Sequence, residues 1–287
     1  MKHKIFGLKS GNCERLGLGV FDGYHLGHQE LAKNCSHLLT FWPHPDILLK
    51  KNSELAMLTT LRELRFYQKN LLVLRFDQDI ARFSALKFLN EIIYKKLQPK
   101  VLVVGYDFHF GYQMQGDVNF IKNWAEKFKS EVVKIEPVSF QNQFVKSSLI
   151  RKYFSENKFE EAINLLGHSY LIIGKVIQGE GRGRTLGFPT ANLKLPDFKL
   201  VPNNGVYKGQ VLLDNYFYQA LIYIGNKPTF RGKFSKNIEV YILNFAGDLY
   251  NKQLKVFLEA KGRDEIVFPN QSELIVQIKK DLADCGG

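Results

Sequence analysis

The order of apolar and polar positions divides the chain into two halves with different periods. In the first half, short apolar runs at residues 16–21, 71–76 and 101–105 have the length and content of buried strands. The segments between them, residues 26–33 and most of 58–97, have helical composition. Strands that alternate with helices are typical of a mostly parallel sheet covered by helices. This half is therefore predicted to be an α/β/α domain.

From residue 169 onward, the pattern changes to short runs with strand periodicity, separated by turn residues. The expected strands are residues 170–173, 205–213, 216–224, 238–245 and 254–260. Five or six short strands of this kind are typical of a small antiparallel β-barrel. A helical pair over 148–166 ends at Gly167, and a terminal helix is expected over 272–283. We therefore predict two domains, residues 1–167 and 168–287.

The composition supports a globular chain with two cores. A hydrophobic content of 45% with 24% charged residues, over 287 residues, excludes a disordered or fibrous protein. No apolar run approaches the roughly 18 residues that cross a bilayer. The start of the chain also lacks the apolar core of a signal peptide.

The charge limits the kinds of partner that the chain can have, and the cysteines indicate its cellular compartment. The formal charge of +12 is shared by both halves without a basic tail, so it favours anionic substrates or RNA, or is simply a solvated surface. Cys13, Cys35 and Cys285 are odd in number and lack metal-ligand spacing, which indicates free thiols in a reducing compartment. We therefore expect a cytoplasmic protein without a membrane anchor.

Two histidines stand in the turn between the first strand and the first helix. His25 and His28 are three residues apart, so at a helix start they share one face, and Gly27 between them lets a ligand come close. Such a turn offers a helix N-terminus to phosphate, and paired imidazoles can donate hydrogen bonds to charge developing on phosphorus. The alternative is a pair of surface histidines on an ordinary first turn.

A glycine-rich segment, residues 174–192, is the second candidate for chemistry. Arg182 and Arg184 lie among its glycines, and guanidinium groups in a bendable loop suit phosphate. Thr190 and Asn192 flank one residue, so on an extended backbone both side-chain oxygens point the same way and can share Mg²⁺ with a nucleotide. The alternative is a long hairpin with solvated arginines.

Both segments belong to longer strings that resemble known families. The order Gly-x-Val-x-x-Gly-x-Gly-Arg-Gly-x-x-Leu-Gly-Phe-Pro-Thr-Ala-Asn-Leu, from Gly174, resembles the ATP-binding signature of riboflavin kinases. Residues 19–28, 40–45, 105–117 and 147–151 are similar to motifs of the bacterial FMN adenylyltransferase module. The resemblance covers essentially the whole chain. It implies a Rossmann-like nucleotidyltransferase domain followed by a kinase β-barrel with a terminal helix.

The resemblance also implies roles for individual residues. In the first half it implies catalytic His25 and His28, nucleotide contacts from Phe21, Asp22, Gly23, Ser147, Ser148 and Arg151, and flavin contacts from Asp107, Phe108 and Phe110. In the second half it implies nucleotide contacts from Gly179, Gly181, Arg182, Gly183, Thr190 and Asn192, with Mg²⁺ held by the last two, a catalytic base at Glu239 and a flavin contact at Arg263. Without the family pattern, the phenylalanines read equally well as core, the serine pair as a helix cap, and Glu239 as a solvated side chain.

The sequence departs from the family pattern at a few positions. Lys146 replaces a serine, Tyr241 a histidine and Asn244 an aspartate. Only 11 residues separate His28 from Thr40, which is near the minimum for a parallel crossover.

Taken together, the sequence predicts a bifunctional enzyme that phosphorylates riboflavin to FMN and adenylylates FMN to FAD. The implied substrates are ATP, riboflavin and FMN, with Mg²⁺ as the metal and flavoproteins as acceptors of the product. One alternative is a kinase whose first half has degenerated. The short crossover between His28 and Thr40 is the observation that suggests it. The other is a nucleic-acid-binding protein. The arginines argue against this alternative, because they lie in a glycine loop and do not form a basic stripe.

Overall fold

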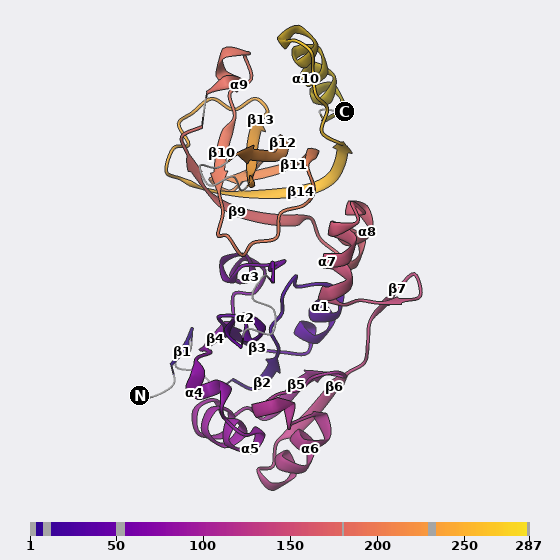
Figure 1. The fold of residues 1–287 in the computed structure, drawn as a ribbon. Coiled ribbons are helices and arrows are strands. Elements are labelled where there is room, and N and C mark those ends of the chain that lie inside the picture. Colours follow the sequence, from indigo (N-terminus) through magenta and orange to yellow (C-terminus); the bar gives the residue numbers. More distant parts are fainter. Residues whose placement is uncertain (1–3, 8–12, 50–54, 180, 229–233, 286–287) are drawn as a thin grey trace. The chain divides into compact units, whose positions relative to one another are not determined.

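The computed structural model describes residues 4–7, 13–49, 55–179, 181–228 and 234–285 (Figure 1). Its contacts divide the chain into two compact units, Met1–Ser147 and Ser148–Gly287. The domain boundary expected at residue 167 stays a prediction. The division by contacts falls earlier because the helices of residues 148–166 pack on the barrel.

The first unit is built on a six-stranded sheet in the order β1-β4-β3-β2-β5-β6. Its strands are β1 (Ile5–Phe6), β2 (Arg15–Leu18), β3 (His37–Trp42), β4 (Leu71–Arg75), β5 (Val101–Gly105) and β6 (Glu131–Ile135). Strands β2 to β6 run parallel to their neighbours, and β1 pairs with β4 antiparallel at one edge. A two-stranded hairpin, β7 (Ser139–Phe140) and β8 (Gln143–Phe144), follows the sheet.

Helical segments cover both faces of this sheet. They are α1 (Leu26–Lys33), α2 (Pro45–Leu48), α3 (Leu61–Tyr67), α4 (Gln78–Ala81), α5 (Ala85–Phe88), a π-helical segment (Leu89–Leu97), a 3₁₀ turn (Tyr112–Met114) and α6 (Val118–Lys127). One core joins the strand residues Leu72 and Leu102 with Ile92 of the π-helical segment. A second core joins Leu38 and Val103 with Leu31 of α1 and Leu64 of α3. The α/β/α prediction is confirmed.

The short crossover still delivers a parallel strand pair. Helix α1 has eight residues, and β2 and β3 pair in parallel from Leu16 opposite His37. The chain leaves β2 toward β3 on one side, whereas β5 lies on its other side. The carboxyl ends of β2 and β5 therefore border a topological switch point, where open α/β sheets bind ligands.

The second unit is a closed six-stranded barrel in the order β10-β13-β12-β11-β14-β9. Its strands are β9 (Tyr170–Ile177), β10 (Ala191–Lys194), β11 (Gly205–Leu213), β12 (Tyr216–Pro228), β13 (Phe234–Ile242) and β14 (Gln253–Arg263), all paired antiparallel. Along β13, Ile238, Val240 and Ile242 are buried, whereas Asn237 and Glu239 are half-buried. Because strand side chains alternate, Glu239 lies on the outer face of the barrel.

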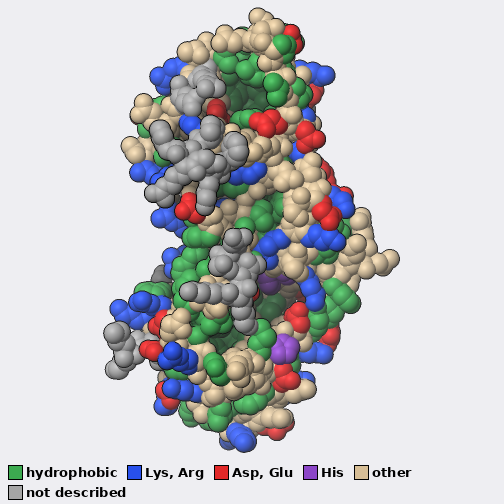
Figure 2. Space-filling view, viewed as in Figure 1, with side chains coloured by type: hydrophobic (Ala, Val, Ile, Leu, Met, Phe, Trp, Pro, Cys, Tyr) green, Lys and Arg blue, Asp and Glu red, His purple; other side chains and the backbone are tan. Residues whose placement is uncertain are grey.

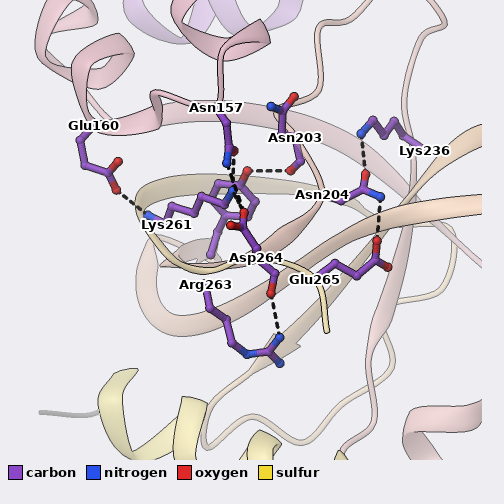
Figure 3. A network of polar contacts seen from close by, with 10 residues as sticks. Asn157, Glu160, Asn203, Asn204, Lys236, Lys261, Arg263, Asp264 and Glu265 are labelled. Atoms are coloured by element: carbon purple, nitrogen blue, oxygen red, sulfur yellow. Dashed lines mark hydrogen bonds and ion pairs between the residues drawn. The ribbon is translucent and has the colours of Figure 1, made fainter. Parts of the chain in front are cut away.

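Three longer helical elements complete this unit, besides the four-residue α9 (Arg182–Thr185): α7 (Ser147–Ser155), α8 (Phe159–Leu166) and α10 (Gln271–Cys285). The ring of Phe159 packs on Tyr207 of β11 at a centroid distance of 5.0 Å. The Lys261 ammonium at the end of β14 contacts Asn157 and Asp264, and the Lys261 backbone N–H donates to Glu160 Oε1 at 3.1 Å (Figure 3). These contacts attach the helical pair to the barrel.

Candidate active sites

Three residues expected in the kinase site meet on the outer face of the barrel. Asn192 of β10 lies directly across from Glu239 of β13, so both side chains share one face. Thr190, just before β10, donates its hydroxyl hydrogen to Glu239 Oε2 at 2.8 Å. Asn237, which the sequence did not single out, donates from Nδ2 to Glu239 Oε1 at 2.9 Å. The carboxylate of Glu239 is thus held on both oxygens.

The glycine loop is shaped around these side chains. A Cβ on Gly179 would come within 2.1 Å of Asn192 Nδ2, so the amide lies over a position that only glycine can hold. A Cβ on Gly183 would sit 2.4 Å from the Phe188 carbonyl oxygen and 3.1 Å from Thr190 Oγ1. Gly181 has φ +74°, a left-handed conformation that glycine adopts freely.

The two arginines of this loop differ in what the structure describes. Arg184 is exposed on α9. The side chain of Arg182 and the whole of Glu180 lie outside the described residues, as do Thr229 and Phe230 of a matched kinase segment.

An apolar surface lies next to Glu239 on the outer face. Val206 and Leu221 are buried there and pack with Tyr223, Tyr241 and Leu282 of α10. Tyr223 is the cross-strand neighbour of Glu239 on β12. On the face drawn in Figure 2, apolar side chains of the barrel unit gather in a recess near acidic ones.

Tyr223 also ends a polar chain on this face. Its hydroxyl donates to Glu265, which accepts a second hydrogen bond from Asn204 Nδ2 at 2.8 Å. Burial, followed by the hydrogen bond to Glu265 and the charges of Glu265 and Glu239, raises the pKa of Tyr223 above its ordinary value. Tyr223 therefore keeps its proton at neutral pH.

Arg263, the expected flavin contact, is engaged with the terminal helix. Its guanidinium binds Asp281 of α10 in a bidentate pair, with Nη2 to Oδ2 at 2.8 Å and Nε to Oδ1 at 3.0 Å. Gln277 adds a donor to Asp281 at 2.7 Å. The pair fixes α10 beside the apolar surface, and a flavin contact by Arg263 stays a prediction.

In the first unit, the two histidines stack at the start of α1. Their ring centroids are 3.7 Å apart, and His25 is the N-cap, with Nδ1 accepting from His28 N at 3.4 Å. A Cβ on Gly27 would lie 3.3 Å from His25 Cε1, so the glycine leaves room for the stack. His28 Nδ1 is buried and has no hydrogen-bond partner among the residues that the structure describes. Burial, and then repulsion by His25, lowers the pKa of His28 well below its ordinary value, so this ring is neutral at pH 7.

The turn before α1 is held by hydrogen bonds between Asp22 and Gly23 and the segment at residues 58 and 59. Phe21 is buried with φ +58°, so the strand ends before it instead of reaching residue 21 as expected. The buried Asp22 carboxylate accepts from Thr59 N at 2.8 Å and Leu58 N at 3.3 Å, and Gly23 N donates to Thr59 Oγ1 at 3.0 Å. These residues shape the turn, and their nucleotide contacts stay predictions.

The residues at the start of α7 contact the segments that follow both strands of the switch point, β2 and β5. Ser147 Oγ donates to the Asp22 carbonyl oxygen at 2.7 Å. Lys146 Nζ lies 3.7 Å from Asp107 Oδ2 and 5.6 Å from the centre of the Tyr106 ring. The β2–α1 turn and the end of β5 are thus joined through residues 146 and 147.

The remaining expected contacts differ in environment. Phe110 is buried in the core with Phe88, and Phe108 stacks on Phe110 at 5.6 Å, which agrees with the core alternative as well as with a flavin surface. Ser148 is exposed on the first turn of α7, and Arg151 is half-buried one turn later. Their contacts with phosphate stay predictions.

Cofactor and membrane features are few in the described part of the chain. It contains no group of three or more His, Cys, Asp and Glu side chains that could hold a metal. Cys13 and Cys35 are free thiols, as expected, while the side chain of Cys285 lies outside the description. None of the described helices combines the length and apolarity needed to cross a membrane.

Comparison with known proteins covers both units. A model of the FAD synthetase family matches residues 10–149, and a riboflavin kinase model matches residues 166–286. Proteins called bifunctional riboflavin kinase/FMN adenylyltransferase are 36% identical in Buchnera aphidicola (92% of this chain, 90% of that protein) and 32% identical in Escherichia coli K12 (93% and 90%).

A solved structure supports the fold along the same length. The crystal structure of a Streptococcus pneumoniae protein named as a macrolide-efflux protein matches with a TM-score of 0.85 and 29% identity, over 100% of this chain and 98% of that one. Its name describes transport, whereas the two family models and the named relatives agree with each other. With one model for each unit and relatives that span both, the chain belongs to the bifunctional riboflavin kinase/FMN adenylyltransferase family.

Proposed function

We propose that this chain makes FAD from riboflavin in two transfers. In the barrel unit, the 5′-hydroxyl oxygen of riboflavin attacks the γ-phosphorus of ATP, which gives FMN and ADP. In the α/β unit, a phosphate oxygen of FMN attacks the α-phosphorus of a second ATP, which gives FAD and pyrophosphate.

One observation carries the kinase assignment. Glu239 lies far along the chain from Thr190 and Asn192, yet Thr190 Oγ1 lies 2.8 Å from Glu239 Oε2 and Asn192 stands directly across from Glu239. A carboxylate held in this way can accept the proton of a primary hydroxyl while its oxygen attacks phosphorus. Glu239 is therefore the proposed general base.

Thr190 and Asn192 fit the proposed Mg²⁺ and nucleotide site. The Thr190 hydroxyl gives its hydrogen to Glu239, so its lone pairs are free to face a cation, and Asn192 adds a carbonyl oxygen. Thr190 and Asn192 would hold Mg²⁺ here, and the bound ion would supply positive charge that offsets the negative charge developing during transfer. The glycines at 179, 181 and 183 let the loop backbone approach those phosphates closely.

The apolar surface beside Glu239 is the proposed seat of the flavin. Val206 and Leu221 provide its buried floor, and Tyr223 and Tyr241 provide aromatic edges. Such a surface suits a planar ring system. Leu282 packs on the same cluster from α10, so the Arg263–Asp281 pair would hold this wall in place.

In the α/β unit, His25 and His28 are the proposed groups that stabilise the transferring α-phosphate. They stand at a helix N-terminus at the switch point of the sheet, where phosphate is favoured. A neutral imidazole still donates one N–H, which suits the stacked pair, because two charged rings 3.7 Å apart would repel each other. Ser147, Ser148 and Arg151 are the proposed further phosphate contacts.

The test supplies the purified chain with riboflavin, ATP and Mg²⁺ and separates FMN from FAD. Glu239→Gln is expected to lower FMN formation by roughly 10² to 10⁴ fold, the usual range for a positioned acid or base, and to leave the conversion of supplied FMN to FAD intact. His25→Ala and His28→Ala are expected to do the reverse. Each variant's retained step is its own control for folding. Parental FMN formation by Glu239→Gln would remove the base assignment.

The alternatives give different outcomes in the same assay. A kinase with a degenerate first half would stop at FMN, and a nucleic-acid-binding protein would turn over no flavin while binding RNA in a salt-sensitive manner. On the face drawn in Figure 2, basic side chains are interspersed with acidic ones and form no stripe, which favours the enzyme. The proposed compartment is the cytoplasm, with flavoproteins as acceptors of the product.

A further inference from the structure

We infer that Asn237 is a positioning residue for riboflavin phosphorylation: its amide holds the Glu239 carboxylate in the orientation in which one oxygen can accept the substrate proton. The inference rests on the proposed role of Glu239 as the base. It adds a residue that neither the glycine loop nor the matched motifs pointed to.

The contact is direct and has the geometry of a strong hydrogen bond. Asn237 Nδ2 lies 2.9 Å from Glu239 Oε1, while Thr190 Oγ1 lies 2.8 Å from Glu239 Oε2. Residues two apart on a strand project from the same face, so Asn237 and Glu239 are neighbours by the geometry of β13 itself. Each carboxylate oxygen thus has one protein donor.

The neighbouring strand directs the Asn237 side chain toward Glu239. The residue across from Asn237 on β12 is Gly225, and the space above it is taken by Tyr223, whose hydroxyl would be 2.3 Å from a Cβ at that position. Tyr223 lies across from Glu239 but gives its hydroxyl hydrogen to Glu265. Among the described residues, the donors recorded on Glu239 are therefore Thr190 and Asn237.

Thr190 and Asn237, the two hydrogen-bond donors to Glu239, have different roles. Thr190 is also the proposed Mg²⁺ contact, so its hydroxyl is shared between the carboxylate and the nucleotide side. The amide of Asn237 carries no charge and does not titrate, so it can hold Oε1 throughout the reaction. A carboxylate has about four lone-pair positions, so two donors leave room for the riboflavin hydroxyl.

The titratable groups around Glu239 do not hold its Oε1, which is held by Asn237. The titratable group that faces Glu239 from β12 is Tyr223, whose hydroxyl donates to Glu265. On β13 itself the titratable neighbour is Tyr241. From β10 the facing residue is the neutral Asn192. Of the loop arginines, Arg184 is exposed on α9. No described side chain has a recorded ion pair with Glu239, so neutral donors hold it in place.

The experiment measures kcat and KM for riboflavin in the full-length chain. Asn237→Ala is expected to lower kcat about 10- to 100-fold, in line with loss of positioning at a reacting group, with KM for riboflavin and ATP changed by less than about twofold. Asn237→Asp places a second carboxylate against Glu239 and should lose at least as much. Asn237→Gln keeps the amide donor and should recover part of the rate. Asn123→Ala, which removes an exposed asparagine on α6 of the α/β unit, is the matched control and should keep the parental kcat.

A double variant separates positioning from mere structure. If Asn237 acts through Glu239, then Asn237→Ala added to Glu239→Gln causes little further loss, because the two residues act as a unit. A parental kcat for Asn237→Ala, or losses that multiply in the double variant, would overturn the inference. Full FMN formation by Glu239→Gln alone would instead refute the proposed base, so the two failures are distinguishable.

Discussion

Gly179 and Asn192 are matched in space: the amide of Asn192 occupies the position toward which any side chain at residue 179 would grow. The added Cβ would stand 2.1 Å from Nδ2 and 2.4 Å from Cγ of Asn192. The glycine loop and β10 therefore depend on each other, and the loop cannot accept even a methyl group there without moving the amide.

Gly179→Ala is expected to lower FMN formation about 10- to 100-fold, because a displacement of about 1 Å at a reacting centre has this effect. FAD formation from supplied FMN should stay at the parental rate. In an Asn192→Ala background, the same substitution should add little, since the clash is gone. Losses that multiply would show that the glycine acts on the backbone, independently of Asn192.

Acid should destabilise the α/β unit through His28. Its pKa is lowered in the folded state, so the unfolded chain binds more protons once the pH falls through the ordinary histidine range near 6.5. Stability contributed by the neutral ring is therefore present above that range and is lost as the pH falls below it. Denaturant titrations between pH 7 and pH 5 should show a steeper loss for the parent than for His28→Gln, by at most about 1.4 kcal/mol per pH unit. Equal slopes would contradict the burial of this ring.

Asp281→Ala should loosen the terminal helix. The substitution removes a bidentate, largely buried pair and leaves Arg263 without its partner, at an expected cost of about 1.5–3 kcal/mol. Urea unfolding of the barrel unit would report the loss, and limited proteolysis would show earlier cutting in α10. Asp284→Ala, an exposed aspartate on the same helix, is the control and should change neither.

Asp22→Ala should impair FAD formation by releasing the turn before α1. The substitution leaves the amides of Leu58 and Thr59 without their acceptor, which costs about 1–3 kcal/mol for a buried donor. Asp22→Asn keeps one acceptor oxygen and should be milder. If Ala and Asn lose FAD formation equally while remaining folded, then the negative charge itself acts on the nucleotide.

The sequence predicted much of both units because their signals are local. The short apolar runs located β2, β4 and β5 of the sheet. The spacing of Thr190 and Asn192 predicted two oxygens on one side of the chain, and both residues lie beside Glu239. The strand register that brings Asn192 across from Glu239 is a long-range property, so only the family pattern could indicate Glu239 in advance. Even so, residue 237 could have been found, because a polar residue two positions from a strand carboxylate faces the same way.

Other features could not be read from the chain. The Asp22 carboxylate accepts hydrogen bonds from amides 36 and 37 residues away, and no local pattern reveals such a contact. The attachment of α7 and α8 to the barrel depends on the half-buried Lys261 and on rings such as Phe159, which look like ordinary surface and core residues in the sequence.

The four-residue strand β10 completes the ring between β9 and β13, and it also carries Asn192. Damage to this short segment would open the cylinder, expose two unpaired strand margins and displace Asn192 from the proposed nucleotide site. A single lesion in β10 is therefore expected to cause both self-association through the open strand margins and loss of turnover.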